Sequence, residues 1–407
     1  MSGTPLPPSA ARSRRIVVAA FGDPGHAFPA IALGRELVAR GHEVWLETWA
    51  RWGEHVEREG MRFAAAPEYH LLEQGKPPLG IYQAAVRACD TTRELIREAD
   101  PDAVVVDILT VAASLAAQVE ERPWATLIPH VFPVGAPGLP PYSVGAVPAR
   151  TRVGARLWGA LRPVLSAGEE QGRRELNGAR ERVGLPPLEH VHGGISRDLA
   201  LVATFPQLEY PRAETRPGVL TTGPLLWEQP YGDVELPPGD DPLVLVAPST
   251  SQDPDHRLLR AALEGLADEP VRVLGAWNRR PPPSPLPEPP NARLVEWVSY
   301  ARTMPRCAAV ICHAGHGTIA RALACGVPVL ACPYAGDQAE NAARLRWSGL
   351  GVSLPRRLQE ARHIRLAVRR LLAEPAYARR TAALAHWVEE HPGGEAAAEA
   401  VEALASN

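Results

Sequence analysis

The stretch His313-Ala-Gly-His-Gly-Thr318 gathers groups that are suited to binding an anion. It directly follows an apolar run typical of a strand and directly precedes residues with helical spacing. Gly315 and Gly317 let the backbone approach a ligand closely, and a helix beginning near Thr318 points its free N–H groups and its positive dipole end at the same place. The His313 imidazole and the Thr318 hydroxyl add side-chain donors. This set predicts a phosphate site, and a diphosphate suits it because several donors meet at short range.

The same turn also matches a dinucleotide-binding fingerprint. Gly315-x-Gly317-x-x-Ala320 has the required spacing, and Asp337 lies about 20 residues further on, where a ribose-binding acid would stand. An NAD-dependent oxidoreductase is therefore an alternative function. However, this fingerprint belongs after the first strand of its domain, whereas three strand-like segments precede it in the same half of the chain.

A second group of candidate residues follows the first predicted strand, in Gly22-Asp-Pro-Gly-His26-Ala-Phe-Pro29. Open α/β sheets bind ligands at the carboxyl ends of their strands, and a histidine there can act as a general base near neutral pH. Asp107 closes another strand of the same sheet edge, where it could bond the imidazole, fix its tautomer and stabilise the imidazolium. The simpler alternatives are a solvated His26 and an Asp107 that caps the next helix.

These residues need a scaffold of alternating strands and helices, and the sequence predicts one in each half. Such alternation implies a parallel sheet with helices on both faces. In the first half the predicted strands cover 16–20, 44–48, 103–107 and 125–128, and the predicted helices cover 27–40, 111–120, 152–165 and 169–183. In the second half the predicted strands cover 243–247, 271–276, 293–298, 309–312 and 329–332, and the predicted helices cover 257–266, 318–325, 338–347 and 358–372.

The stretch 205–241 has few periodic residues and many prolines and glycines, which indicates a linker between two domains. We expect an acceptor-binding N-terminal domain over 1–215, a nucleotide-sugar-binding domain over 216–388, and a final segment over 389–407. The length of 407 residues also favours two domains.

The composition excludes several classes of protein. The net charge is −3 with no long run of one sign, so nothing predicts a nucleic-acid partner or an anionic membrane surface. The five cysteines form no C-x-x-C pair, which favours a reduced, cytoplasmic setting. No apolar stretch approaches the ~20 residues that a membrane span needs. No carboxylate cluster has metal-ligand spacing, so we expect no metal and no cofactor.

The block from His313 to Gln338, with Trp297 upstream, resembles the donor-binding signature of family 1 glycosyltransferases of the GT-B fold. The bacterial macrolide and antibiotic glycosyltransferases are the most similar group, and the plant natural-product enzymes are more distant. The resemblance covers nearly the whole chain, starting at Gly25-His26-x-x-Pro29. It implies two doubly wound Rossmann-like domains that face each other across a crevice.

The resemblance also implies a role for each matching residue. His26 stands where the family keeps its catalytic base, and Asp107 stands where it keeps the base's partner. Trp297 matches the tryptophan that stacks on the donor's base, with the backbone of Val298 beside it. The remaining matches are to the diphosphate and the sugar: His313, Gly315, Gly317 and Thr318 with Ser249, Thr250 and Ser251 for the diphosphate, and Asp337 with Gln338 for the sugar hydroxyls.

Three positions depart from the family pattern. Arg321 stands where the family has a glutamate that bonds the ribose, and an arginine cannot accept a hydroxyl proton. The turn Ala247-Pro248-Ser249 lacks a glycine often found there. The family's Pro-Gln pair after the stacking tryptophan and its neighbour is Ser299-Tyr300 here.

The expected activity is that of an inverting hexosyltransferase that uses a UDP- or dTDP-sugar and acts in antibiotic biosynthesis. The expected acceptor is a hydroxyl of a small apolar polyketide, macrolide or flavonoid-like compound, held by Tyr69, Tyr82, Phe132, Tyr142 and Trp158. Carbon or nitrogen acceptors stay open, as does the choice between monomer and homodimer. Besides the oxidoreductase, a nucleotide-sugar epimerase and a non-catalytic donor-binding protein are the alternatives. The final helix, over 395–405, resembles the family's segment that crosses back to the N-terminal domain.

Overall fold

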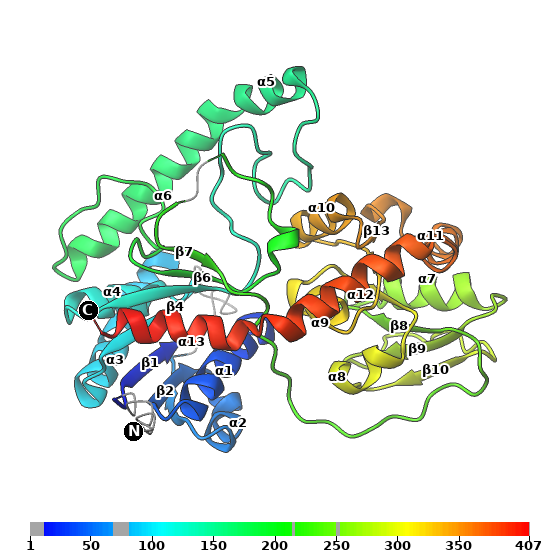
Figure 1. Cartoon of the computed structure of the whole chain (residues 1–407), viewed down its shortest axis with the longest axis horizontal. Coiled ribbons are helices and arrows are strands. Elements are labelled where there is room, and N and C mark those ends of the chain that lie inside the picture. Colours follow the sequence, from blue (N-terminus) through cyan, green and yellow to red (C-terminus); the bar gives the residue numbers. More distant parts are fainter. Residues whose placement is uncertain (1–11, 68–80, 214–215, 250–252, 407) are drawn as a thin grey trace, which may run out of the picture.

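The computed structural model describes residues 12–67, 81–213, 216–249 and 253–406. This part of the chain forms two α/β units, each a parallel sheet with helices on both faces (Figure 1). Within it the first sheet has seven strands in the order β3-β2-β1-β4-β5-β6-β7, and the second has six in the order β10-β9-β8-β11-β12-β13. The predicted fold class is therefore confirmed.

The first sheet and its helices occupy the N-terminal half of the chain. Its strands are β1 (Arg15–Ala19), β2 (Glu43–Thr48), β3 (Arg62–Ala65), β4 (Ala103–Asp107), β5 (Trp124–Ile128), β6 (Ala200–Val202) and β7 (Val219–Thr221). Its helices are α1 (Pro24–Ala39), α2 (Gly53–Arg58), α3 (Ile81–Ala99), α4 (Val111–Val119), α5 (Arg152–Ala160) and α6 (Arg162–Arg182).

The second sheet follows in the C-terminal half. Its strands are β8 (Leu243–Ala247), β9 (Arg272–Ala276), β10 (Ala292–Val295), β11 (Ala309–Cys312), β12 (Val329–Ala331) and β13 (Gly351–Ser353). The helices of this half are α7 (Arg257–Leu266), α8 (Tyr300–Thr303), α9 (His316–Ala324), α10 (Gln338–Ser348), α11 (Ala361–Ala373), α12 (Pro375–Glu390) and α13 (Gly393–Leu404). Short 3₁₀ turns cover Ala50–Trp52, Pro206–Leu208, Met304–Arg306 and Arg356–Leu358.

Both faces of each sheet are buried, which explains why the central strands are continuous apolar runs. In β1, Val17 packs with α3 and α4, while its neighbour Val18 packs with α1 and α13 on the other face. In β8, Val244 packs in a core with α7 and α11, while its neighbour Leu245 packs on the other face in a core with α9. Each sheet therefore sits between two layers of helices.

The sequence missed the short strands β3, β6, β7 and β13, which have three or four residues and lie toward the sheet edges. One of them corrects the predicted domain boundary at residue 215. Because β7 pairs with β6, the chain leaves the first sheet only after Thr221. The helix predicted over 152–165 is divided at Leu161 into α5 and α6, since Pro163 lacks the N–H that a continuous helix would use.

The last helix, α13, packs on the N-terminal unit and contacts α1, β4 and β5 (Figure 1). Arg40 Nε and Nη2 each lie 2.8 Å from a carboxylate oxygen of Glu402, and His42 Nε2 lies 2.8 Å from the first of these oxygens. These bonds lower the pKa of Glu402 to about 2, with the Arg40 hydrogen bond as the largest cause. Gly393 lies where a Cβ would come within 2.8 Å of the Gly223 backbone, so the two segments that join the units touch each other.

Candidate active site

Each unit has a topological switch point at the carboxyl edge of its sheet. In the first sheet β1 and β4 are neighbours, but α1 and α4 leave them toward opposite faces. In the second sheet β8 and β11 are neighbours, and α7 and α9 also diverge. Such points form crevices that bind ligands in open α/β folds. His26 and Asp107 lie at the first switch point, and Ser249 and His313 lie at the second.

The structure brings His26 and Asp107 into direct contact. His26 Nδ1 lies 2.8 Å from Asp107 Oδ2, and the Asp107 side chain is fully buried while that of His26 keeps 17% of its exposure. The other carboxylate oxygen, Oδ1, accepts a hydrogen bond of 3.0 Å from Leu109 N. Asp107 therefore fixes the turn before α4, whose N-cap residue Thr110 makes no side-chain cap.

The electrostatics of this pair suit a base. Burial lowers the pKa of His26, but the charge and the hydrogen bond of Asp107 outweigh it, and the net pKa is raised above 6.5. A carboxylate that accepts from Nδ1–H selects the tautomer in which Nε2 carries a lone pair. The arrangement can thus take a proton at Nε2 and stabilise the resulting imidazolium.

Two further side chains of the N-terminal unit lie near His26. The ring centroids of His26 and His130 are 6.4 Å apart in an edge-to-face arrangement, and His130 Nδ1 lies 2.8 Å from the Val131 carbonyl. The Tyr142 hydroxyl lies 3.4 Å from the same nitrogen. Burial lowers the pKa of His130, so its ring is neutral at pH 7. His130 belongs to no motif in the sequence, although its place just after β5 puts it on the same sheet edge as Asp107.

Asp337 links the two units electrostatically. It is the N-cap residue of α10 in the C-terminal unit, and its Oδ2 accepts a hydrogen bond of 3.1 Å from Asn341 Nδ2. Its negative charge raises the pKa of His26 in one unit and of His313 in the other, although burial has the larger influence on each. Asp337 therefore lies within electrostatic reach of both switch points.

The turn after β11 has the shape expected of an anion site. Helix α9 begins at His316, two residues earlier than predicted, so Gly317 and Thr318 belong to its first turn. A Cβ on Gly315 would lie 2.4 Å from His313 Nε2, whereas a Cβ on Gly317 would meet nothing within 4 Å. Gly315 therefore makes room for the imidazole, and Gly317 leaves open space at the helix N-terminus. Burial lowers the pKa of His313, so its ring is neutral at pH 7.

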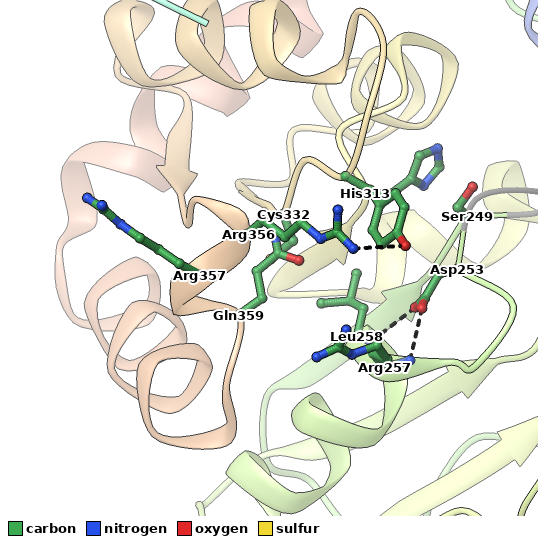
Figure 2. A pocket seen from close by; sticks show the side chains of 10 residues that line it. Ser249, Asp253, Arg257, Leu258, His313, Cys332, Arg356, Arg357 and Gln359 are labelled. Atoms are coloured by element: carbon green, nitrogen blue, oxygen red, sulfur yellow. Dashed lines mark hydrogen bonds between the residues drawn. The ribbon is translucent and has the colours of Figure 1, made fainter.

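A cavity of about 420 Å³ opens beside His313 and Ser249, as Figure 2 shows. Its lining comes from the segments that follow β8, β11, β12 and β13: Ser249, Asp253, Arg257, Leu258, His313, Cys332, Tyr334, Arg356, Arg357 and Gln359. In Figure 2 the His313 ring and the Ser249 hydroxyl lie on the same side, while Arg357 points away. The predicted partners Thr250 and Ser251 lie outside the described residues.

Trp297 lies in the loop after β10, which ends at Val295 rather than at residue 298 as predicted. The guanidinium carbon of Arg279 lies 4.9 Å from the centroid of the Trp297 ring. A cation–π contact of this kind holds the indole in place from one side. Val298, the next residue, is buried in the core of the unit. Arg279 has no motif signal, because only the fold brings it to the tryptophan.

Two positions that depart from the family pattern, Ser299-Tyr300 and Arg321, lie near neighbouring side chains in the structure. Burial raises the pKa of Tyr300, and the neighbouring Thr318 side chain opposes this effect. Burial lowers the pKa of Arg321, and the charge of Glu228 opposes this effect. The Glu228 carboxylate also accepts hydrogen bonds from the Ser299 hydroxyl and from the backbone of α8. Glu228 therefore supplies an acid near the position where the family has its ribose-binding glutamate.

Gln338 shapes the loop before α10. Its Oε1 accepts hydrogen bonds of 2.8 and 3.2 Å from the backbone N–H groups of Tyr334 and Ala335. The same helix is anchored to the segment after β6 by Arg344, whose Nη1 lies 2.9 Å from Glu209 Oε2. These bonds hold the Asp337 end of α10 in place relative to the N-terminal unit.

The structure does not bring the predicted acceptor aromatics together. Phe132 is buried in a small core with Ile128, and Tyr82 packs partly buried against the core that contains α3. Trp158 lies on α5, which has no buried residue and extends away from the sheets (Figure 1). Only Tyr142 lies near His26, through His130, and Tyr69 is outside the described residues.

An apolar cavity that the sequence did not predict lies at the carboxyl edge of the first sheet. It has a volume of about 130 Å³ and is bounded by segments after β1, β2 and β4 and by α3.

Among the described residues, no three histidine, cysteine or acidic side chains are grouped so that they could hold a metal ion. Within those same segments no helix has the length and apolar character needed to cross a membrane.

Comparisons with known proteins agree with this architecture. Residues 16–124 match the N-terminal domain model of glycosyltransferase family 28, and residues 268–404 match the C-terminal domain model described as erythromycin biosynthesis protein CIII-like. O-mycaminosyltylonolide 6-deoxyallosyltransferase of Streptomyces fradiae is 30% identical over 434 residues, covering 95% of this chain and 97% of that protein.

Two further similarities extend over nearly the whole chain. 4'-Demethylrebeccamycin synthase of Lentzea aerocolonigenes is 28% identical, covering 96% of this chain and 98% of that protein. The solved structure of the kitacinnamycin glycosyltransferase has the same fold, with a TM-score of 0.76 and 23% identity over 97% of this chain and 99% of that one. The chain therefore belongs to the GT-B glycosyltransferases of the macrolide and antibiotic type.

Proposed function

We propose that this glycosyltransferase moves a hexose from a UDP- or dTDP-sugar to a hydroxyl of a small apolar natural product, with inversion at the anomeric carbon. The acceptor oxygen forms the new bond to that carbon as the bond to the diphosphate breaks. His26 Nε2 takes the acceptor's proton, and the nucleoside diphosphate leaves with the electron pair. Such positioned base catalysis is worth about 10²–10⁴-fold in rate.

The observation that carries this proposal is the buried His26–Asp107 pair within electrostatic reach of Asp337 on the opposite unit. A base on one unit and a group able to bond sugar hydroxyls on the other are then close enough to act on one substrate. Asp337 also acts on His313, at the N-terminus of α9. The sugar would lie between the base and the diphosphate, as an in-line displacement requires.

The donor half of the proposal rests on three features. Gly317 leaves open space at the N-terminus of α9, which attracts anions through its free N–H groups and dipole. The His313 ring and the Ser249 hydroxyl line the cavity of about 420 Å³ at the carboxyl edge of the same sheet. Trp297 offers a flat apolar surface for a base, with Arg279 supporting the other side. Preorganised donors of this kind stabilise the charge that gathers on a leaving diphosphate.

The acceptor class comes from the relatives rather than from the cavity. The Streptomyces fradiae relative is named for transfer to a glycosylated tylonolide, and the Lentzea relative is named for rebeccamycin synthesis. We infer that this chain also acts on a natural product with a large apolar surface. The apolar cavity at the edge of the first sheet has room for one ring of such a compound.

Ligand-dependent melting of the purified protein tests the donor class first. UDP, dTDP, GDP and NAD are added in turn, and a ligand at 100 times its Kd should stabilise the folded state by about 2.7 kcal/mol. We expect the melting temperature to rise with UDP or dTDP. A rise with NAD alone would mean that the Gly315-x-Gly317 turn binds a nicotinamide cofactor, and the proposed transfer would be abandoned.

Replacing Trp297 by alanine should weaken binding of the nucleotide that raises the melting temperature. Loss of base stacking costs about 1–3 kcal/mol, or roughly 5- to 150-fold in Kd. Calorimetric titration measures the change, and Trp347→Ala on α10 is the matched control because this indole contacts Tyr210 instead. Equal affinity in the Trp297 variant and the wild type would show that the base binds elsewhere.

A further inference from the structure

The apolar cavity of about 130 Å³ is connected to the His26–Asp107 pair through two of its lining residues, Phe21 and Leu109. Phe21, at one side of the cavity, contacts His26 edge-on with ring centroids 6.0 Å apart. Leu109, at another side, donates its backbone N–H to the Asp107 carboxylate. Two residues that line the cavity therefore also contact the proposed base and its partner. The volume of the cavity approaches the ~150 Å³ of an engineered apolar cavity that binds benzene, so it suits one ring.

One ionisable group, Glu47, stands in this lining, whose other members are apolar apart from Thr92 and Thr110. It lies near the carboxyl end of β2 and is only 3% exposed. The Thr92 hydroxyl on α3 lies 3.0 and 2.8 Å from its two oxygens, and within the described segments no basic side chain forms an ion pair with it. Because one hydroxyl donates a single hydrogen bond, the carboxyl keeps unused accepting capacity toward the cavity.

A buried carboxyl with so little compensation is costly for the folded protein. Burial raises the pKa of Glu47 to about 7, although the Thr92 hydrogen bond opposes this effect. An apolar residue of similar size would fill the position at no such cost. In apolar ligand pockets, a few buried polar groups bind the polar atoms of the ligand. These polar groups determine which ligand is accepted.

We propose that Glu47 is a specificity-determining residue that accepts a hydrogen bond from an O–H or N–H group on the ring of the acceptor that enters this cavity. The inference rests on the proposed function, which places the acceptor beside His26. It narrows the acceptor class to compounds whose buried ring carries a hydrogen-bond donor in addition to the group that receives the sugar.

Two small acceptors test the inference directly. 2,6-Dihydroxynaphthalene and 6-methoxy-2-naphthol both present one hydroxyl for transfer, but only the first has a donor at the far end. A site that bonds a hydroxyl discriminates strongly against an analogue without it. At pH 8, above the pKa of about 7 that burial gives Glu47, the carboxyl is mostly charged. The wild type should then bind the diol at least about tenfold more tightly, because hydrogen bonds to charged groups are the stronger ones.

Three variants distinguish recognition of the acceptor's hydroxyl by Glu47 from a purely structural role of this residue. Glu47→Leu removes the polar group at similar size and should abolish the preference for the diol. Thr92→Val removes the α3–β2 hydrogen bond but keeps the carboxyl, so its preference should persist. Glu43→Gln, a carboxyl-to-amide change at the other end of the same strand, is the control. If Glu47→Leu fails to fold, Ala88→Leu fills the cavity from α3 and should weaken binding of both compounds.

Binding is measured by calorimetry without donor, and kcat/KM is measured with the nucleotide sugar. If Glu47→Leu lowers the affinity for both compounds equally, Glu47 has a structural role and the inference is overturned. A wild type with no preference for the diol also overturns it. If the preference depends on Glu47 but no sugar is transferred, the cavity is a ligand site and the proposed transfer is what fails.

Discussion

His26→Ala should lower kcat for sugar transfer by about 10²–10⁴-fold, the usual contribution of a positioned general base. The affinity for UDP or dTDP should not change, because the imidazole lies at the first sheet and the residues proposed to bind the nucleotide lie at the second. Initial rates with saturating donor and acceptor measure the first effect, and nucleotide titration measures the second. A variant that retains wild-type kcat would exclude His26 as the base.

The pH profile gives this prediction a second readout. The base must be neutral, and Asp107 holds the pKa of His26 above its ordinary 6.5 against the opposing effect of burial. The kcat/KM of the wild type should therefore fall as the pH drops through that raised pKa. In Asp107→Asn the charge is lost, so the acid limb should move to lower pH while the maximal rate also decreases. If the acid side of the kcat/KM profile is the same in Asp107→Asn as in the wild type, a group other than His26 takes the proton.

His313→Ala should lower kcat/KM for the donor by about 10²–10³-fold, the range seen when one donor to a developing negative charge is removed. The imidazole is neutral at pH 7 and lines the cavity at the carboxyl edge of the second sheet, so it can donate a hydrogen bond to a diphosphate oxygen. Its loss should also weaken UDP or dTDP binding. Initial rates at limiting donor measure the first effect, and nucleotide titration measures the second.

His386→Ala on α12 is the control for this substitution, because that histidine is 70% exposed and pairs only with glutamates of its own helix among the described residues. It should keep the wild-type kcat/KM and nucleotide affinity. If His313→Ala loses donor turnover but binds the nucleotide normally, the imidazole acts mainly in the transition state. If neither quantity changes, the diphosphate lies elsewhere and the assignment of the α9 site fails.

Much of the fold follows from local patterns. Parallel strands covered on both faces must be apolar throughout, so β1, β4, β8 and β11 are predictable as continuous runs. Their carboxyl ends meet at the sheet edges, so the sequence alone predicts that His26 lies with Asp107 and Ser249 with His313. Short strands such as β7 lack enough residues for a pattern, so the boundary predicted at residue 215 comes too early in the chain.

The rest of the candidate site depends on contacts between residues far apart in the chain. The sequence holds no sign that Arg279 covers Trp297 or that Glu228 stands near Arg321, because side-chain periodicity reports only which face of one element is buried. The same holds for Glu47, whose type is ordinary for a strand end but whose burial beside an apolar cavity is unusual.

The sequence by itself determined the class of fold and the residue types suited to a base and to an anion site. These follow from local spacing, since a strand end and a helix start are set by neighbouring residues. Only the tertiary structure decided that Asp337 acts on His26 and His313 together and that Glu47 borders the acceptor side. Both depend on how two separately folded sheets and their helices pack, because packing alone sets which side chains share a crevice and how deeply each is buried.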